Sequence, residues 1–213
     1  MSENKSKKKQ FEEIKTDLFA SQDVIVENAL KKVEKMGDHS FIHPLLHVLM
    51  ENENENIQDK ISKMLSELKV SKAEDELLSA LEDEAFIKIH GQILSFIWNS
   101  GFQPADHIAT ITQVAIQGDY MAALKALTLL DNIDGPFQEE HIMESTIELR
   151  NYLMENSDSD KKDLLVAMLN LLEGADVDES EFFTTALAEA CIIFVLVVIA
   201  IGTSSGVGRS LGH

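Results

Sequence analysis

Cysteine, proline, aromatic residues and positive charge are all scarce in this chain of 213 residues. The single cysteine, Cys191, excludes an internal disulfide and any zinc site built from several cysteines, and it suits a reducing compartment. Three prolines and 6% aromatic residues, beside recurrent Leu, Ile, Ala, Glu and Lys, favour helices over strands. We therefore expect an all-α protein, and 45% hydrophobic content is ordinary for a chain that folds.

Basic residues are outnumbered by acidic ones, 18 to 37, and are unevenly placed. The first ten residues, MSENKSKKKQ, hold four lysines and one glutamate, which predicts a disordered basic tail over residues 1–14, with weak contact to anionic lipid as the alternative. No apolar stretch follows them, so we expect no secretory signal peptide. Residues 11–181 hold 13 Lys and Arg against 35 Asp and Glu, a charge that repels phosphate backbones and argues against nucleic acid as a partner.

A recurring helix end organises the middle of the chain. An aliphatic residue precedes a polar or acidic turn in LFASQD, LMENEN, LEDEA, IQGDY and LMENSDSD. We call these aliphatic residues the turn residues, and they are Leu18, Leu49, Leu81, Ile116 and Leu153. Successive turn residues are 31, 32, 35 and 37 positions apart. Each unit is predicted to hold a first helix after the turn and a second helix that leads to the next turn. Paired helices with a period in the low thirties are typical of a helical solenoid.

Aliphatic residues also recur at fixed distances after each turn residue. Positions eight, twelve and sixteen further on fall on one stripe of an α-helix, because steps of four stay on one side of a helix with 3.6 residues per turn. Most of these positions are aliphatic: Val26, Ile57, Ile89, Leu124, Leu30, Ile61, Ile93, Leu165, Leu65, Ile97 and Leu169. Thr128, Asn132 and Lys161 interrupt the stripe.

The stretch IHPLLHVLMENENENIQDKISKMLSELK, residues 42–69, resembles the junction between two HEAT repeats. It has a Pro-Leu-Leu helix, a short acidic turn and an aliphatic helix that ends in Leu-x-x-Leu. A weaker resemblance covers residues 15–175, although the Val-Arg pair common after the turn in that family is missing, and armadillo-like and other paired-helix arrays stay open. The resemblance implies a right-handed α-solenoid of about five paired-helix repeats. It also implies a curved scaffold that binds proteins, without shared catalytic residues.

The composition changes abruptly after an acidic linker over residues 176–181. Residues 182–202 carry one charge, Glu189, and predict a transmembrane helix, with a short polar tail over residues 203–213. The alternative is a last, buried helix that caps the repeats. The first prediction gives a tail-anchored protein with its repeats in the cytoplasm, and the second a cytoplasmic protein. Residues expected in the membrane include Phe182, Phe183, Ile192, Phe194, Val198 and Ile201.

Few side chains suggest a binding site. His43 and His47 lie four apart on a predicted helix, a spacing that suits a metal, but the Glu of an H-E-x-x-H motif is absent and solvated surface histidines are the alternative. Trp98 is either an anchor for a partner or a residue packed between repeats. We predict no catalytic, cofactor-binding or metal-binding residue, and we take His43, His47 and Trp98 as candidates for partner binding.

These patterns favour a non-enzymatic scaffold or adaptor that presents an acidic surface to a basic protein or peptide. The alternative is an enzyme or enzyme subunit on a HEAT-like solenoid, as some pigment-attaching lyases and DNA glycosylases are. That alternative needs a polar cluster in the groove, or basic residues for DNA, and the sequence shows neither clearly.

Overall fold

The computed structural model describes residues 2–175, and the regular elements of these residues are all helices, with no strand among them. This confirms the predicted all-α class. Three short 3₁₀ helices, η1 (His39–Phe41), η2 (Glu84–Ile89) and η3 (Ala105–His107), precede the α-helices that follow them. The ten α-helices of the described residues are α1 (Ser2–Leu18), α2 (Asp23–Met36), α3 (Ile42–Glu51), α4 (Glu55–Ser66), α5 (Ser71–Glu82), α6 (His90–Ser100), α7 (Ile108–Gln117), α8 (Tyr120–Leu130), α9 (Glu139–Glu155) and α10 (Lys162–Glu173).

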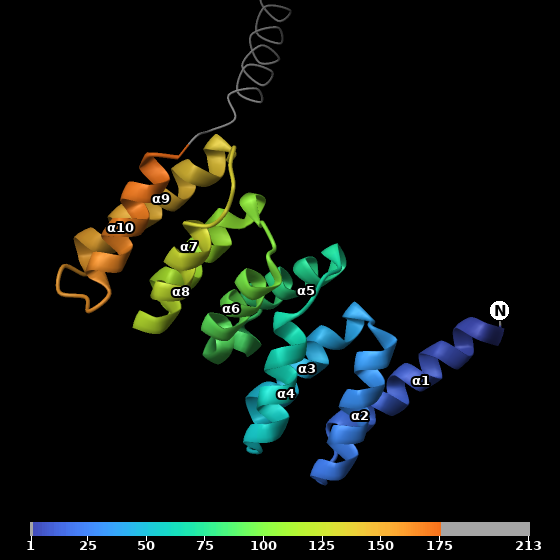
Figure 1. The fold of residues 1–213 in the computed structure, drawn as a ribbon. Coiled ribbons are helices and arrows are strands. Elements are labelled where there is room, and N and C mark those ends of the chain that lie inside the picture. The colour runs from blue at the N-terminus through green and yellow to red at the C-terminus, as the bar shows by residue number, and fades with distance from the viewer. Residues whose placement is uncertain (1, 176–213) are drawn as a thin grey trace, which may run out of the picture.

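The helices form two layers. Helices α1, α3, α5, α7 and α9 pack in that order in one layer, and α2, α4, α6, α8 and α10 pack in that order in the other. Each helix of the first layer also packs on the helix that follows it in the chain. Figure 1 shows the resulting succession from α1 at one end to α10 at the other. Packing is therefore almost entirely between helices that are one or two elements apart in sequence.

Aliphatic stripes explain why these segments are helices and which side of each is buried. Val26 and Leu30 in α2, and Ile57, Ile61 and Leu65 in α4, are at most 1% exposed. They occupy the positions predicted eight, twelve and sixteen residues after a turn. The burial of these residues confirms the predicted stripe in α2 and α4, because steps of four keep side chains on one side of a helix.

The turns between helices have local causes. Gly37 follows α2 with φ 58° and Gly101 follows α6 with φ 74°, a left-handed conformation that side chains with a Cβ rarely adopt. The side chain of Asn54 accepts a hydrogen bond from the N–H of Asn56 at the start of α4, and Asp119 accepts one from the N–H of Ala122 at the start of α8. These residues fix the ends of α2 and α6 and the starts of α4 and α8.

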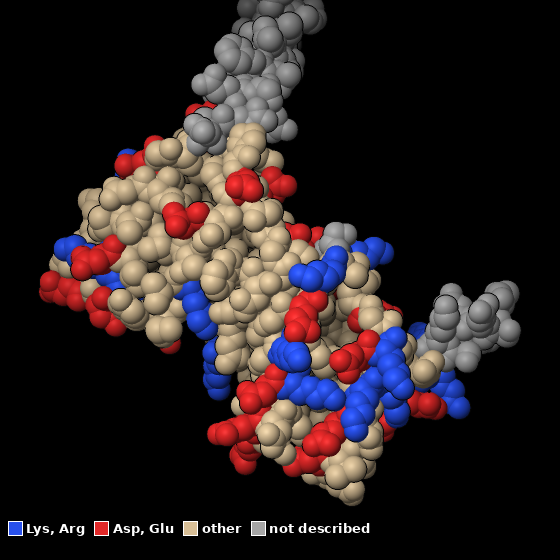
Figure 2. Space-filling view, viewed as in Figure 1, with Lys and Arg blue, Asp and Glu red and all other residues tan. Residues whose placement is uncertain are grey.

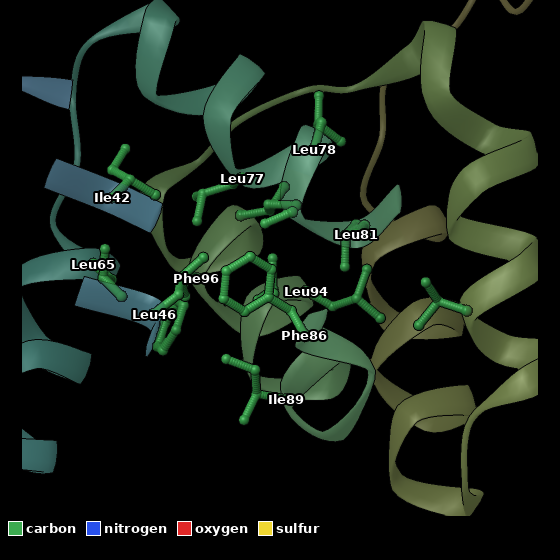
Figure 3. Packing of buried hydrophobic residues seen from close by; sticks show 14 of the residues in the cluster. Ile42, Leu46, Leu65, Leu77, Leu78, Leu81, Phe86, Ile89, Leu94 and Phe96 are labelled. Atoms are coloured by element: carbon green, nitrogen blue, oxygen red, sulfur yellow. The ribbon is translucent and has the colours of Figure 1, made fainter. Parts of the chain in front are cut away.

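Phe86 of η2 lies at the centre of the core between three helices. Its side chain is 0% exposed. Figure 3 shows it among labelled side chains from α3, α5 and α6 that include Leu46, Leu81 and Leu94. The 3₁₀ turn before α6 therefore joins neighbouring helix pairs rather than only linking α5 to α6.

The N-terminal boundary differs from the sequence prediction. A disordered tail was predicted over residues 1–14, but α1 begins at Ser2 and packs on α2 and α3. Ile14 and Leu18 are each 1% exposed, and the ring of Phe11 lies 4.4 Å from that of Phe41 between centroids. Phe11, Ile14 and Leu18 share one side of a helix, so burial of this side holds the segment on the domain.

The predictions for the C-terminal segments fall outside the described residues. These are the acidic linker 176–181, the membrane helix 182–202 with Phe182, Phe183, Ile192, Phe194, Val198 and Ile201, and the polar tail 203–213. Among residues 2–175, no helix combines the length and the apolar content that a membrane crossing requires.

Candidate functional site

A cavity of about 280 Å³ opens where the ends of α2 and α4 meet η1, α3 and the start of α5. The left-handed Gly37 ends α2 here and turns the chain into η1. Most of the lining is apolar, and Leu68 and Val70 come from the short connection between α4 and α5. We call this cavity the cleft. Its apolar lining residues are Val33, Ile42, Leu45, Met64, Leu65, Leu68, Val70 and Ala73.

The rim of the cleft carries more negative than positive charge. Glu34, Asp38 and Glu67 lie on it together with Lys69, and all four side chains are exposed. The N–H of Ser40 donates a 3.0 Å hydrogen bond to the carboxylate of Asp38 and lowers the pKa of Asp38 below its usual value. The Asp38 carboxylate therefore stays charged to lower pH than an ordinary aspartate. A ligand with an apolar group and neighbouring positive charge matches this arrangement.

The size of the cleft limits what it can hold. Sites for small-molecule ligands and cofactors usually enclose about 300–1,000 Å³. At about 280 Å³ the cleft falls just below that range. One or two side chains of a protein partner fit it better than a large cofactor does.

Two histidines and a glutamate connect the cleft to α5. His39 lines the cleft, and its Nδ1 lies 3.2 Å from Oε1 of Glu76. The Nε2 of His43 lies 3.2 Å from the carbonyl oxygen of Glu76 and 3.5 Å from its Oε2. A carbonyl oxygen can only accept, so the first contact is a hydrogen bond when His43 carries a proton on Nε2. These contacts fasten the start of α3 to α5.

The predicted partner-binding histidines are half-buried between helices. The rings of His43 and His47 lie 5.5 Å and 4.6 Å from the ring of Phe86, centroid to centroid. Packing on a core phenylalanine holds both side chains against η2. Their role in this structure is to join α3 to the following elements, and His39 is the histidine that lines the cleft.

Trp98 lies apart from the histidines. It belongs to α6, in the other layer, and is 48% exposed, so its ring is not enclosed between helices. An exposed tryptophan is a common anchor in protein interfaces. The structure thus separates the three predicted partner-binding residues into a packed pair and one exposed ring.

Charge is unevenly spread over the described surface. Figure 2 shows acidic and basic side chains intermingled over the N-terminal half and a broad area with few charges over the C-terminal half. Helix α7, with the sequence IATITQVAIQ, has no charged residue. Within residues 2–175, no group of three or more His, Cys, Asp or Glu side chains is placed to hold a metal ion. Glu34, Asp38 and Glu67 are acidic residues of the N-terminal half that lie on the rim of an apolar hollow, the cleft.

Sequence reasoning missed the cleft because its lining comes from five separate elements, α2, η1, α3, α4 and α5. A weak signal was present, since Leu68 and Val70 put two large apolar residues into a short connection where polar residues are usual.

No family model, no curated protein and no solved structure matches this chain.

Proposed function

We propose that this chain is a non-enzymatic protein–protein interaction scaffold that binds a basic peptide segment in the cleft. The observation that carries the proposal is an apolar hollow of about 280 Å³ with three carboxylates and one lysine on its rim. Glu34, Asp38 and Glu67 are exposed, so they are free to meet a positively charged partner.

The scaffold itself is proposed to be a right-handed α-solenoid of about five paired-helix repeats, similar to HEAT or armadillo repeats. Two observations support this. The described helices form two layers and pack almost entirely on helices one or two elements away in sequence, and the predicted turn residues fall in the last turn of α1, α3, α5, α7 and α9. In such an array each pair buries its apolar stripe against the next.

The partner is defined by the chemistry of the cleft. One aliphatic or aromatic side chain would fill the apolar lining and remove it from water. Lys or Arg on either side of that anchor would lie close to the rim carboxylates. Exposed charges of this kind chiefly raise the association rate and specificity, so binding should weaken as salt increases.

Fluorescence anisotropy with a labelled peptide tests the proposal. The probe is a ten-residue peptide with one central leucine flanked by lysines. Two control peptides carry alanine in place of that leucine or glutamates in place of the lysines. We expect the double variant E34K/E67K to bind the lysine peptide about tenfold more weakly or worse. The variant E84K, which reverses one exposed carboxylate of η2 away from the cleft, is the control.

Two results would overturn the proposal. One is equal binding of the lysine and glutamate peptides, which would show that the rim charge does not select the partner. The other is equal loss of binding in E84K and in E34K/E67K, which would place the contact elsewhere on the acidic surface.

Location at a membrane remains a prediction from the sequence, with the helical domain in the cytoplasm. Residues 182–202 lie outside the described residues, so the prediction rests on their apolar composition. Resistance of the full chain to carbonate extraction from membranes is the measurement that tests it.

A further inference from the structure

The last turn of α4 brings free carbonyl groups to the wall of the cleft. The last four carbonyl groups of an α-helix have no partner within the helix, and in α4 they belong to residues 63–66. The hydroxyl of Ser100 donates to the carbonyl oxygen of Leu65 at 3.3 Å. Within the described residues, no backbone N–H of the connection after α4 donates to the others. Because Met64, Leu65 and Glu67 line the cleft, these acceptors are available to a ligand there.

The other helix that ends at the cleft is closed by the chain itself. At the end of α2, the N–H of Gly37 donates a 3.0 Å hydrogen bond to the carbonyl oxygen of Val33. Glu67 takes the corresponding place after α4 with φ −110°, so it lacks the left-handed conformation of Gly37. The end of α4 is thus the one of these two that a ligand can complete.

The end of α7 shows which group suits such carbonyl oxygens in this protein. The ammonium of Lys161 donates there to the carbonyl oxygens of Ala115, Ile116 and Gly118. An ammonium has three donors and no acceptor, and it meets the partial negative charge at the C-terminal end of a helix. In the described residues no lysine does the same for α4, since Lys69 lines the cleft without donating to these carbonyl groups.

Carboxylates and apolar side chains surround the free carbonyl groups. Glu67 directly follows α4, and Glu34 lies in the last turn of α2. Both line the cleft, so a positive charge at the end of α4 lies near two carboxylates and near the negative ends of two helices. Met64 and Leu68 form apolar wall beside them, and the stem of a lysine side chain can lie along such a wall.

We infer that a lysine of the bound peptide caps α4, because its ammonium donates to the free carbonyl groups of residues 63–66 as Lys161 does at the end of α7. The inference rests on the proposed peptide binding and adds the identity of the basic residue. It gives the cleft a selectivity that charge alone does not give. Trimethyllysine keeps the positive charge of lysine but has no N–H donor, so the rim carboxylates attract both residues while the end of α4 accepts only from lysine.

Fluorescence anisotropy on the full-length chain compares the two residues. One probe is the lysine peptide, and the other has the same sequence with every lysine replaced by trimethyllysine. We expect the trimethyllysine peptide to bind about tenfold more weakly, because hydrogen bonds to a charged group are lost. The variant E34Q/E67Q should weaken both peptides and keep their ratio, because it removes rim charge and leaves the carbonyl groups in place.

Backbone carbonyl ¹³C shifts locate the ammonium and separate lost hydrogen bonds from the added bulk of the methyl groups. In HNCO spectra of the labelled full-length chain, the carbonyl signals of Met64 and Ser66 should move downfield with saturating lysine peptide. They should move much less with saturating trimethyllysine peptide. The carbonyl signals of Ala115 and Ile116 are the control, because Lys161 already donates to these groups.

Four outcomes contradict the inference, and the lysine peptide alone reports on the proposed function. Equal affinity of the two peptides would leave peptide binding intact and show that charge alone selects the partner. A tenfold difference without movement of the Met64 and Ser66 signals would assign the difference to methyl bulk. Equal movement of these signals with both peptides would show that the ammonium protons are not involved. Absence of binding by either peptide would overturn the proposed function together with the inference.

Discussion

The Nζ of Lys161 lies 2.9 Å from the carbonyl oxygen of Ala115, 46 positions earlier in the chain. The same ammonium donates to the carbonyl oxygens of Ile116 and Gly118, so its three protons meet three carbonyl groups at the end of α7. Lys161 is only 5% exposed. It closes a helix end whose carbonyl groups carry partial negative charge, and it joins the turn after α9 to α7.

Replacing Lys161 with methionine should destabilise the domain while preserving most of the side-chain volume. Buried hydrogen bonds to a charged group contribute about 1.5–3 kcal/mol, so we expect a loss of that order in the free energy of unfolding. Urea denaturation followed by circular dichroism measures it. The matched control is K162M at the next, exposed position. Equal stability of K161M and K162M would show that the contact contributes nothing.

Replacing Ile61 with aspartate should unfold the array. Ile61 is 0% exposed on the buried stripe of α4, and an uncompensated buried charge costs about 3–5 kcal/mol. The control is I87D, because Ile87 in η2 is 51% exposed. Thermal melting should separate the two variants clearly. Similar melting temperatures for both would mean that the assigned stripe does not face the core.

His90 should make stability depend on pH. Burial lowers the pKa of His90 below its ordinary value of 6.5, although contacts with the backbone of Asp83 and Ala80 oppose the shift. The unfolded chain then binds the proton more readily, so the stabilising effect is complete above about pH 6.5 and declines as the pH falls through that value toward the lowered pKa. Burial raises the pKa of Glu74, which acts in the opposite direction at acid pH.

Comparison of wild type with H90Q isolates this effect. Urea midpoints measured at about pH 7.5 and pH 5.5 should fall more in the wild type than in H90Q. A decline of the same size in both proteins would assign the pH dependence to other groups.

The positions of the helices could be predicted because each segment repeats one local rule. Leu18 is the last residue of α1, and Leu81 lies one residue before the end of α5. Ile93 and Ile97, on the predicted stripe of α6, are 0% exposed. An aliphatic stripe and a polar turn depend only on residues close in sequence, so both could be predicted locally.

The features that were not predicted depend on residues that are distant in sequence. Lys161 interrupts the aliphatic stripe, yet it is buried, because its ammonium donates hydrogen bonds to carbonyl groups at the end of α7. These acceptors lie more than 40 positions earlier in the chain, so no local pattern indicates them. The lysines of residues 1–14 led to the prediction of a disordered tail, whereas Phe11 and Ile14 pack this segment on the domain. His43 and His47 pack on Phe86, which no local pattern indicates. The cleft likewise requires five elements, α2, η1, α3, α4 and α5, to meet.

Hydrogen–deuterium exchange with and without the leucine and lysine peptide shows where on the full chain the peptide binds. We expect slower exchange at the end of α2, at the start of α3 and across the connection from α4 to α5, where the cleft residues Val33, Ile42, Leu68 and Val70 lie. This protection should be lost in E34K/E67K and kept in E84K. Protection confined to α7, α8 and α9, or no protection at peptide concentrations that saturate anisotropy, would contradict the claim that the cleft is the binding site.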